Sequence, residues 1–524
     1  MKRRYLASLL LLMAVLFGGC FQDLGNYDYV ALDDLTIELP DKTYRLPLGA
    51  QLQINPIITT TIPEDDLEYR WEVIALDEVS QYNDFLVFAT GKNLNFTTAL
   101  STLMPSLSTY SMRLHILQKS NGRQFYSETF SYSVVGQING LMVLHGDEEK
   151  SDIGILRAAE FLATKDTATT AIYPHFYSSR NGKFIPGKGH SIVQFIASYM
   201  EWSPGGTGNA DVVVITDKGG VLGSYSTIEE KGDWNSMFYG HLNKGKAESY
   251  ELDGQTAFAV DSGELYIKTA LQNFYVTPDM PASKGYYFGS SVMMTSNPIQ
   301  MQGFFFDKKS RGFIGMRYVF NAGGGSSGIY ALETTTPFNA ANMNADLLFL
   351  DKGGAANHFL AAMKQDDGTK FVVELHPNQS KQSLFSWAKY DMSSLPEVAD
   401  ANYFAWGENM INMCYYASPT NVYRFTASNG APLVAEKLMT TSGVEISFGN
   451  EVVTMMKILK PNKSERPSYS YYNYNKILLI STYAGTPGSG KVYSCTINQL
   501  TGRVASCNVY SGFDQIRDAN IKGI

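Results

Sequence analysis

The chain has 524 residues, of which 44% are hydrophobic and 18% are charged, and its formal net charge is −8. This composition excludes general disorder, and the length exceeds that of a single hydrophobic core, so two or more domains are expected. The acidic balance argues against nucleic acid as a partner, because a phosphate backbone demands a basic surface.

The first twenty residues are typical of a lipoprotein export signal. Three basic residues at 2–4 precede an apolar run at 6–17, and Cys20 follows two glycines. The run is shorter than the roughly 20 apolar residues of a membrane-spanning helix, so we interpret residues 1–19 as a cleaved signal peptide. Small residues before the cysteine predict that Cys20 is lipidated and that residues 20–34 form a tether. The alternative is an ordinary secretory signal with an incidental cysteine.

Residues 35–136 are predicted to form an immunoglobulin-like β-sandwich. Short runs of strand-forming residues alternate with turn signals, and the segment SNG at 120–122 predicts a hairpin before a strand at 125–135. About 100 residues with short strands of this kind fit a sandwich. We expect Trp71 to anchor its core.

Three short motifs give this region a family resemblance. The sequence GNYDY stands at 25–29, YRWE at 69–72 and YSMRL at 110–114. Together with the lipobox, they resemble the PKD-like lipoproteins of Bacteroidetes. The resemblance implies an immunoglobulin-like or PKD-like module followed by a larger all-β domain, and it supplies no catalytic residues.

Residues 137–524 are predicted to form a seven-bladed β-propeller. A hydrophobic strand, a polar turn and a second strand recur, with onsets at 140, 211, 257, 303, 358, 403 and 446. A period of about 45 residues with several strands per unit is typical of propeller blades. The long first interval predicts an insertion at 158–205. The strands after Lys476 complete the last blade or form an eighth, and the alternative fold is a pair of irregular sandwiches.

Two cysteines are positioned for a disulfide. A three-residue turn at 500–502, with Gly502 at positive φ, places Cys495 directly opposite Cys507. A pair in this register can be bonded in an oxidising compartment. Cys414 is expected to be a buried thiol.

No sequence pattern predicts catalysis, a metal or a cofactor. The glycine-rich segment at 182–189 lacks the hydroxyl residue that a phosphate-binding loop needs after its lysine. No metal-ligand spacing is present, and the acidic segment at 365–368 is a turn without spaced calcium ligands. We therefore predict a protein that is not an enzyme. Acids from different blades could still form a glycosidase pair, which keeps a propeller glycosidase or lyase as an alternative.

Aromatic residues in loop-like segments are the predicted ligand-binding groups. Flat amphipathic rings stack on sugars and lose little entropy on binding. The alternative is that these rings pack between blades. The candidates are Tyr199, Trp202, Trp234, Tyr469, Tyr471, Tyr472 and Tyr474.

The resemblance suggests a function, because similar lipoproteins accompany outer-membrane glycan-uptake systems. We predict a non-catalytic carbohydrate-binding accessory, anchored to the outer membrane by lipid alone, with a glycan and outer-membrane uptake proteins as partners. Whether it faces the cell surface or the periplasm stays open. A protein-interaction scaffold at the cell envelope is the other alternative, since a propeller supports many activities.

Overall fold

The computed structural model describes most of the chain after residue 33. The described residues are 34–47, 50–74, 85–98, 101, 103–104, 108–135, 138–162, 170–195, 211–225, 227–238, 246–253, 256–269, 288–294, 300–321, 324–330, 337–354, 358–378, 383–408, 410, 412–428, 430–460 and 473–522. The chain divides into two compact units, one of residues 1–42, 54–94 and 111–131 and the other of residues 43–53, 95–110 and 132–524. None of the described helices is long and apolar enough to cross a membrane.

The N-terminal strands form the predicted immunoglobulin-like sandwich. They are β1 (Leu35–Glu38), β2 (Thr43–Pro47), β3 (Gln51–Ile54), β4 (Ile57–Thr60), β5 (Leu67–Ile74), β6 (Phe85–Thr90), β7 (Leu94–Thr97), β8 (Thr109–Gln118), β9 (Gln124–Tyr126) and β10 (Phe130–Val135), with the 3-10 helix η1 (Glu64–Asp66) before β5. The main sheet has the order β2–β10–β8–β5–β6, with β9 beside β8, while β1–β4 and β3–β7 are two-stranded sheets.

Trp71 anchors the core of these strands, as expected. Its side chain is fully buried, and its Nε1 donates a hydrogen bond to the carbonyl oxygen of Gly91 at 3.0 Å. The indole also meets the ring of Phe130 edge-on, with 6.3 Å between ring centroids. A buried tryptophan with a bonded N–H combines a large apolar area with a satisfied polar atom.

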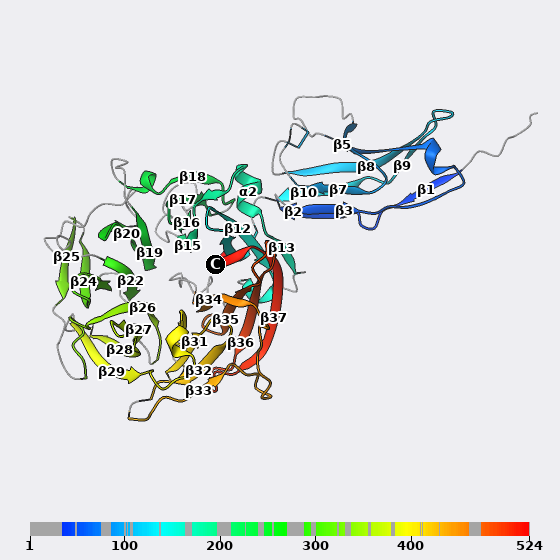
Figure 1. Ribbon diagram of the computed structural model, residues 1–524. Coiled ribbons are helices and arrows are strands. Elements are labelled where there is room, and N and C mark those ends of the chain that lie inside the picture. Colours follow the sequence, from blue (N-terminus) through cyan, green and yellow to red (C-terminus); the bar gives the residue numbers. More distant parts are fainter. Residues whose placement is uncertain are drawn as a thin grey trace, which may run out of the picture. The chain divides into compact units, whose positions relative to one another are not determined.

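The described residues after 136 form seven more sheets, which we number as blades 1 to 7 (Figure 1). Blade 1 contains β11 (Gly140–Gly146), β12 (Lys150–Arg157), β13 (Ala171–Tyr173), β14 (Ile185–Pro186) and β38 (Gln515–Lys522). Blade 2 contains β15 (Gly189–Phe195), β16 (Asp211–Thr216), β17 (Gly219–Ser224) and β18 (Glu230–Asp233). Blade 3 contains β19 (Ala247–Asp253), β20 (Thr256–Asp261) and β21 (Glu264–Thr269). Blade 4 contains β22 (Phe288–Met294), β23 (Gln300–Asp307), β24 (Gly312–Asn321) and β25 (Gly324–Tyr330).

The remaining blades have four strands each. Blade 5 contains β26 (Ala345–Lys352), β27 (Phe359–Gln365), β28 (Lys370–Asn378) and β29 (Ser383–Asp391). Blade 6 contains β30 (Tyr403–Trp406), β31 (Met413–Ala417), β32 (Val422–Thr426) and β33 (Ala435–Lys437). Blade 7 contains β34 (Val452–Ile458), β35 (Ile477–Tyr483), β36 (Gly490–Ile497) and β37 (Val504–Phe513). Short 3-10 helices lie at η2 (Ala159–Phe161), η4 (Asn235–Met237) and η6 (Val398–Asp400).

The C-terminal strand closes the blades into a ring. The innermost strands are β38, β15, β19, β22, β26, β30 and β34, and each contacts the next around the circle. Strand β38 pairs with β11 from Gly140↔Lys522 to Gly146↔Gln515. Asp518 of β38 accepts hydrogen bonds from Lys457 Nζ at 2.6 Å and from the backbone N–H of Ile192 at 2.9 Å, which joins blades 7, 1 and 2. The seven-bladed propeller is confirmed, and the strands after Lys476 complete blades 7 and 1 without forming an eighth.

The repeat was visible in the sequence because many blade strands are buried on both faces. All six residues of β16, DVVVIT, are buried, and six of the seven residues of β35 are buried. A short continuous apolar run bounded by turns is typical of a fully buried strand. Strands of this kind therefore leave recognisable apolar runs in the sequence.

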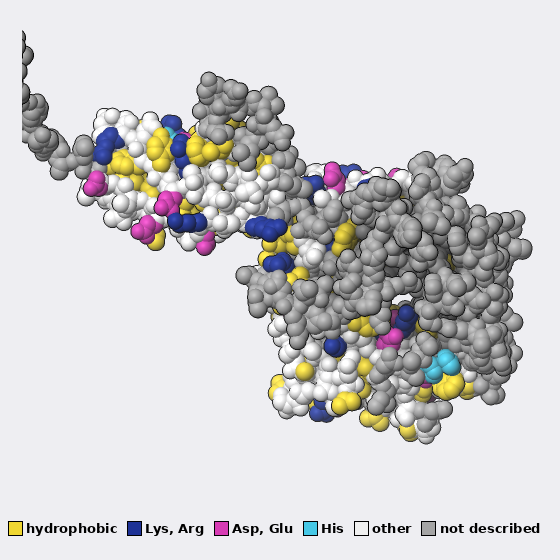
Figure 2. Space-filling model, turned by 180° about the vertical axis from the view of Figure 1, so that it is seen from behind, with side chains coloured by type: hydrophobic (Ala, Val, Ile, Leu, Met, Phe, Trp, Pro, Cys, Tyr) yellow, Lys and Arg dark blue, Asp and Glu magenta, His cyan; other side chains and the backbone are white. Residues whose placement is uncertain are grey.

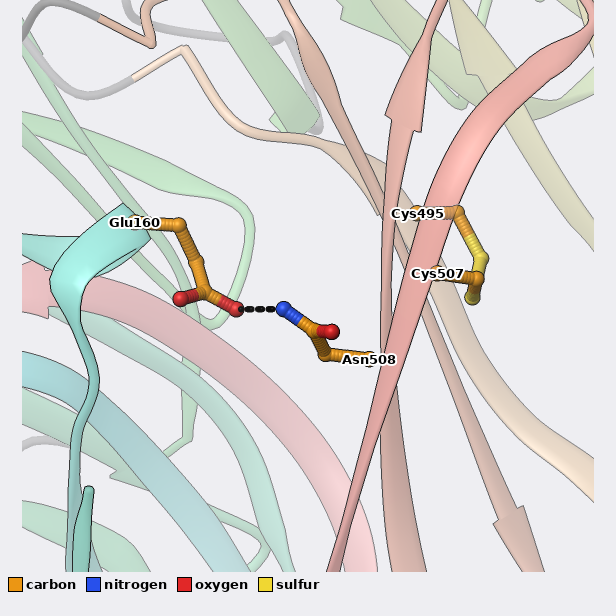
Figure 3. Close-up of a disulfide and its surroundings, with 4 residues drawn as sticks. All are labelled: Glu160, Cys495, Cys507 and Asn508. Atoms are coloured by element: carbon orange, nitrogen blue, oxygen red, sulfur yellow. Dashed lines mark hydrogen bonds between the residues drawn. A yellow bond between two sulfur atoms is a disulfide. The ribbon is translucent and has the colours of Figure 1, made fainter.

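The predicted cysteine register is confirmed in blade 7. Cys495 of β36 lies opposite Cys507 of β37, and the two sulfur atoms are bonded (Figure 3). Gly502 in the connecting turn has a φ of 67°, the left-handed conformation that glycine adopts without a steric penalty. Cys414 is free and buried, and burial raises the pKa of its thiol.

Glu160 fastens blade 1 to the strand that carries this disulfide. Its carboxylate accepts a hydrogen bond from Asn508 Nδ2 at 3.0 Å (Figure 3). It also accepts one from the Tyr510 hydroxyl at 2.6 Å. Both partners belong to β37 of blade 7. Blade 1 is therefore joined to the C-terminal part of the chain both by this contact and by the pairing of β11 with β38.

The predicted insertion at 158–205 contains the helix α2 (Phe176–Asn181), which is held by a buried carboxylate. Asp152 of β12 is 2% exposed and accepts a hydrogen bond from the Ser178 backbone N–H at 3.0 Å. It also bonds Nδ1 of His175 at 3.1 Å. This hydrogen bond to Asp152 raises the pKa of His175.

We expect the His175–Asp152 contact to stabilise the fold mainly at low pH. A raised pKa in the folded state contributes stability below the ordinary histidine value, and the contribution is lost as pH rises through the folded value. His175→Gln should therefore lower the free energy of unfolding more at about pH 5.5 than at about pH 8.5. Urea denaturation at the two pH values measures this difference, and an equal loss at both would contradict the assignment.

Candidate functional site

Most of the predicted ligand-binding residues lie outside the described part of the chain, as does the predicted lipidation site. These are Tyr199, Trp202, Tyr469, Tyr471, Tyr472 and Cys20. Their roles stay predictions. The structure places the two remaining candidates, Trp234 and Tyr474.

Trp234 is part of the protein interior, which corrects its predicted role. It is 3% exposed, and its Nε1 donates a hydrogen bond to Asp261 Oδ2 at 2.8 Å. Its ring meets Phe238 edge-on, with 5.3 Å between centroids. The glycine and aspartate before Trp234 suggested an exposed loop, but they end strand β18, and the indole turns inward to join blades 2 and 3. It offers no free face to a ligand.

Tyr474 lies partly buried where the connection from β34 to β35 ends. Its hydroxyl donates a hydrogen bond to Glu408 Oε2 at 2.7 Å, and its ring packs against the core between blades 7 and 1. Burial and the neighbouring Glu408 raise the pKa of its hydroxyl. The hydroxyl is thus already engaged, and a contact of this ring with a ligand stays a prediction.

A different tryptophan, Trp387, presents its ring at the surface of blade 5. It is 52% exposed and belongs to β29, the outermost strand of the blade. The pairing of β28 with β29 shifts between Glu374↔Ala388 and Leu375↔Ser386, which leaves Trp387 as the extra residue of a bulge. A β-bulge changes the direction of a side chain, and bulges are common beside functional sites.

The bulge brings Trp387 against two histidine rings. His358 precedes β27 and His376 lies on β28, and their ring centroids are 4.4 Å apart. Trp387 meets His358 at 5.0 Å and 66° and meets His376 at 5.5 Å and 88°. These edge-to-face contacts fix the orientation of the indole. We call Trp387, His358 and His376 the ring cluster.

The ring cluster is bonded to a buried carboxylate. Glu374 is 2% exposed, and its Oε1 lies 2.5 Å from His358 Nδ1. Its Oε2 accepts hydrogen bonds from the Tyr390 hydroxyl at 2.8 Å and from Asn412 Nδ2 at 3.2 Å. Burial and the bond to Glu374 raise the pKa of Tyr390, while burial lowers the pKa of His376.

Close packing between blades 5 and 6 fixes the position of Asn412, one of the two donors to Glu374 Oε2. Asn412 has a φ of 46°, a conformation that is uncommon for residues other than glycine. A Cβ atom on Gly354 would lie 2.5 Å from Asn412 Oδ1. Gly354 therefore allows Asn412 to reach Glu374 across the blade boundary.

The ring cluster lies on the propeller face where the first strand of each blade ends and the second strand begins. In an antiparallel blade, the first-to-second and third-to-fourth connections leave from the same end. The cluster lies where β26 connects to β27 and β28 to β29. Strands β15 and β16 flank residues 196–210, and β34 and β35 flank residues 461–472, and both pairs are first and second strands of their blades.

This arrangement is suited to binding and orienting a ligand. An exposed indole stacks on an apolar surface, and the imidazole nitrogens supply hydrogen-bonding groups beside it. Figure 2 shows histidine side chains beside hydrophobic ones on the propeller surface. Among the described residues, no group of three or more histidine, cysteine or acidic side chains is placed to hold a metal ion.

Sequence reasoning missed the ring cluster because it favoured aromatics in loops. Trp387 lies within a strand in which burial alternates: Ser386, Ala388 and Tyr390 are buried and Trp387 is exposed. A tryptophan between two small residues in an outer strand could have been recognised as surface-exposed. The contact of Trp387 with two histidines from other strands could not have been recognised from the sequence.

Several solved structures resemble the chain at low sequence identity. A DUF4784 family protein from Bacteroides caccae is 9% identical, with 76% of this chain and 95% of that chain covered and a TM-score of 0.30. The WD40 domain of SCAP from fission yeast is 9% identical, with 62% and 75% covered and a TM-score of 0.34. TolB from Acinetobacter baumannii is 9% identical, with 80% of each chain covered and a TM-score of 0.30. Scores of this size add nothing to the fold that the strands themselves define.

The sequence comparison is more specific for the N-terminal third of the chain. No curated protein matches the chain. The model of the PKD-like family matches residues 20–189, which include the three motifs at 25–29, 69–72 and 110–114. Residues 20–189 of this protein are thus similar to the PKD-like family.

Proposed function

We propose that this protein is a non-catalytic carbohydrate-binding accessory of the outer membrane, and that the ring cluster is its binding surface. The observation that carries the proposal is the half-exposed indole of Trp387, oriented by two histidine rings above a buried carboxylate. Pyranose rings have apolar faces that stack on such an indole. A rigid aromatic group loses little conformational entropy when it binds.

The cellular setting belongs to the same proposal. Lipidation of Cys20 would anchor the protein to the outer membrane, since acyl chains contribute roughly 0.8 kcal/mol per buried methylene group. The match of residues 20–189 to the PKD-like family supports this setting, through the resemblance to envelope lipoproteins. Outer-membrane uptake proteins would then be its partners, on a face of the membrane that fractionation and surface proteolysis can identify.

A glycan array tests the proposal directly. Purified residues 21–524 are applied to the array, and every glycan that binds is then tested for release of sugar products. Binding without release is the expected result. Release of product would replace the proposal with a propeller glycosidase or lyase, and failure to bind any glycan would favour the protein-interaction scaffold.

Replacing the exposed indole should abolish most of this binding. Trp387→Ala removes the stacking surface, and we expect the dissociation constant for the best glycan to rise about tenfold or more. Calorimetric titration measures the change. Val509→Ala is the matched control, because Val509 is also 52% exposed but lies on blade 7. Equal affinity of the Trp387 variant and the control would show that the ring cluster is not the binding surface.

A further inference from the structure

The hydrogen bonds around Glu374 determine which nitrogen of His358 carries a proton. An ionised carboxylate can only accept hydrogen bonds. Oε2 of Glu374 accepts from Tyr390 and Asn412, and Oε1 lies 2.5 Å from His358 Nδ1. Nδ1 must therefore be the donor of that bond. In a neutral imidazole with its proton on Nδ1, Nε2 keeps a lone pair and can accept a hydrogen bond.

That acceptor lies in the ring cluster. His358 contacts both His376 and Trp387 through its ring, and no residue that the structure describes bonds its Nε2. A sugar stacked on Trp387 would bring hydroxyl groups beside this ring. A hydroxyl that donates to Nε2 would satisfy both atoms, whereas an O-substituted or deoxy sugar has no proton to donate at that position.

We propose that Glu374 is a positioning residue: it keeps the proton of His358 on Nδ1, so that Nε2 accepts a hydrogen bond from a ligand hydroxyl held against Trp387. The part of this inference that concerns a glycan ligand rests on the proposed function, whereas the part that concerns the tautomer of His358 does not. It makes the site selective for glycans with a free hydroxyl at the contact position. The carboxylate itself never touches the ligand.

Glu374→Gln should reverse the tautomer while leaving the side-chain volume unchanged. The amide oxygen would remain where Tyr390 and Asn412 donate, which turns the amide NH₂ toward His358. Nδ1 must then accept, and the proton moves to Nε2. Nitrogen-15 NMR of the imidazoles reports this directly in the ligand-free protein, and a merely structural role of Glu374 would not move the proton.

The N-terminal strands offer a matched control. His115 Nδ1 lies 2.7 Å from Glu72 Oε1, and Arg113 Nε donates to Glu72 Oε2 at 2.8 Å. The pair has the same arrangement, but Nε2 of His115 is buried with no hydrogen-bond partner among the described residues. Glu72→Gln should therefore reverse the tautomer of His115 and leave glycan affinity unchanged.

The binding experiment compares the best array glycan with its monodeoxy analogues, in wild type and in Glu374→Gln. In wild type, one deoxy analogue should bind about tenfold more weakly than the parent. In Glu374→Gln, the parent should weaken by a similar factor and the penalty for that deoxy position should disappear. If every deoxy analogue behaves alike in both proteins, or if NMR finds a proton on Nε2 of His358 in wild type, whether that proton replaces the one on Nδ1 or is present beside it, the inference is wrong. If the tautomer is as stated but no glycan binds, the proposed function fails and the positioning role of Glu374 stands.

Discussion

Deleting residues 515–522 is expected to prevent the propeller from closing. Strand β38 is the innermost strand of blade 1. Its residues Ile516, Ala519 and Ile521 are buried in the core shared with blade 7. Full burial of one isoleucine contributes about 1.5–3 kcal/mol, so the loss of two removes a large part of a net stability of about 5–15 kcal/mol. We expect the truncated protein to lose cooperative thermal unfolding and to aggregate, as measured by circular dichroism and size-exclusion chromatography.

Adding the missing strand in trans separates ring closure from a general folding defect. A synthetic peptide of residues 515–522 should restore cooperative unfolding, because β38 pairs with β11 along its whole length. A peptide with the same composition in scrambled order is the control. A second variant, Asp518→Ala, keeps the strand but removes its bonds to Lys457 and to Ile192, and should lower stability without preventing closure. Cooperative folding of the truncated protein without any peptide would contradict the role given to β38.

The parts of the fold that could be predicted are those encoded locally. Strands that are buried on both faces leave apolar runs in the sequence, and the register at Cys495 and Cys507 follows from the glycine at position 502. The predicted strand at 125–135 shows where local reasoning fails. It is divided into β9 and β10, because Ser127 exchanges hydrogen bonds with the backbone of Leu114 between them. Its period of two cannot reveal that interruption.

The ring cluster could not be predicted because its parts are far apart in the sequence. Glu374 is 16 residues from both His358 and Tyr390 and 38 from Asn412, which belongs to the next blade. The bulge that directs Trp387 toward the histidines contains no glycine or proline to announce it. The same limit misled the assignment of Trp234, whose partner Asp261 belongs to blade 3. Side-chain networks between blades form only when the propeller is closed, so no local sequence pattern predicts them.

Removing the disulfide is the second change for which we expect a large effect. In the chain-entropy model, a cross-link between residues 12 positions apart stabilises a protein by about 3 kcal/mol, because it restricts the unfolded chain. The double variant Cys495→Ala and Cys507→Ala should therefore lower the free energy of unfolding by about that amount, as measured by urea denaturation. The pair lies in the β36–β37 hairpin, directly before the strand that closes the ring, so local loosening there would also weaken closure.

A reductant supplies the control for this variant. Wild type treated with dithiothreitol should approach the stability of the double variant. The double variant itself should not respond, since it retains only Cys414, which is buried, and Cys20, which is predicted to be lipidated. Glu160→Gln tests the neighbouring fastening, because it weakens the contacts to Asn508 and Tyr510 without touching the sulfur atoms. Its effect should add to that of the double variant if the two act independently. If wild type unfolds identically with and without reductant, and the double variant is equally stable, the disulfide contributes nothing to holding β37 in place.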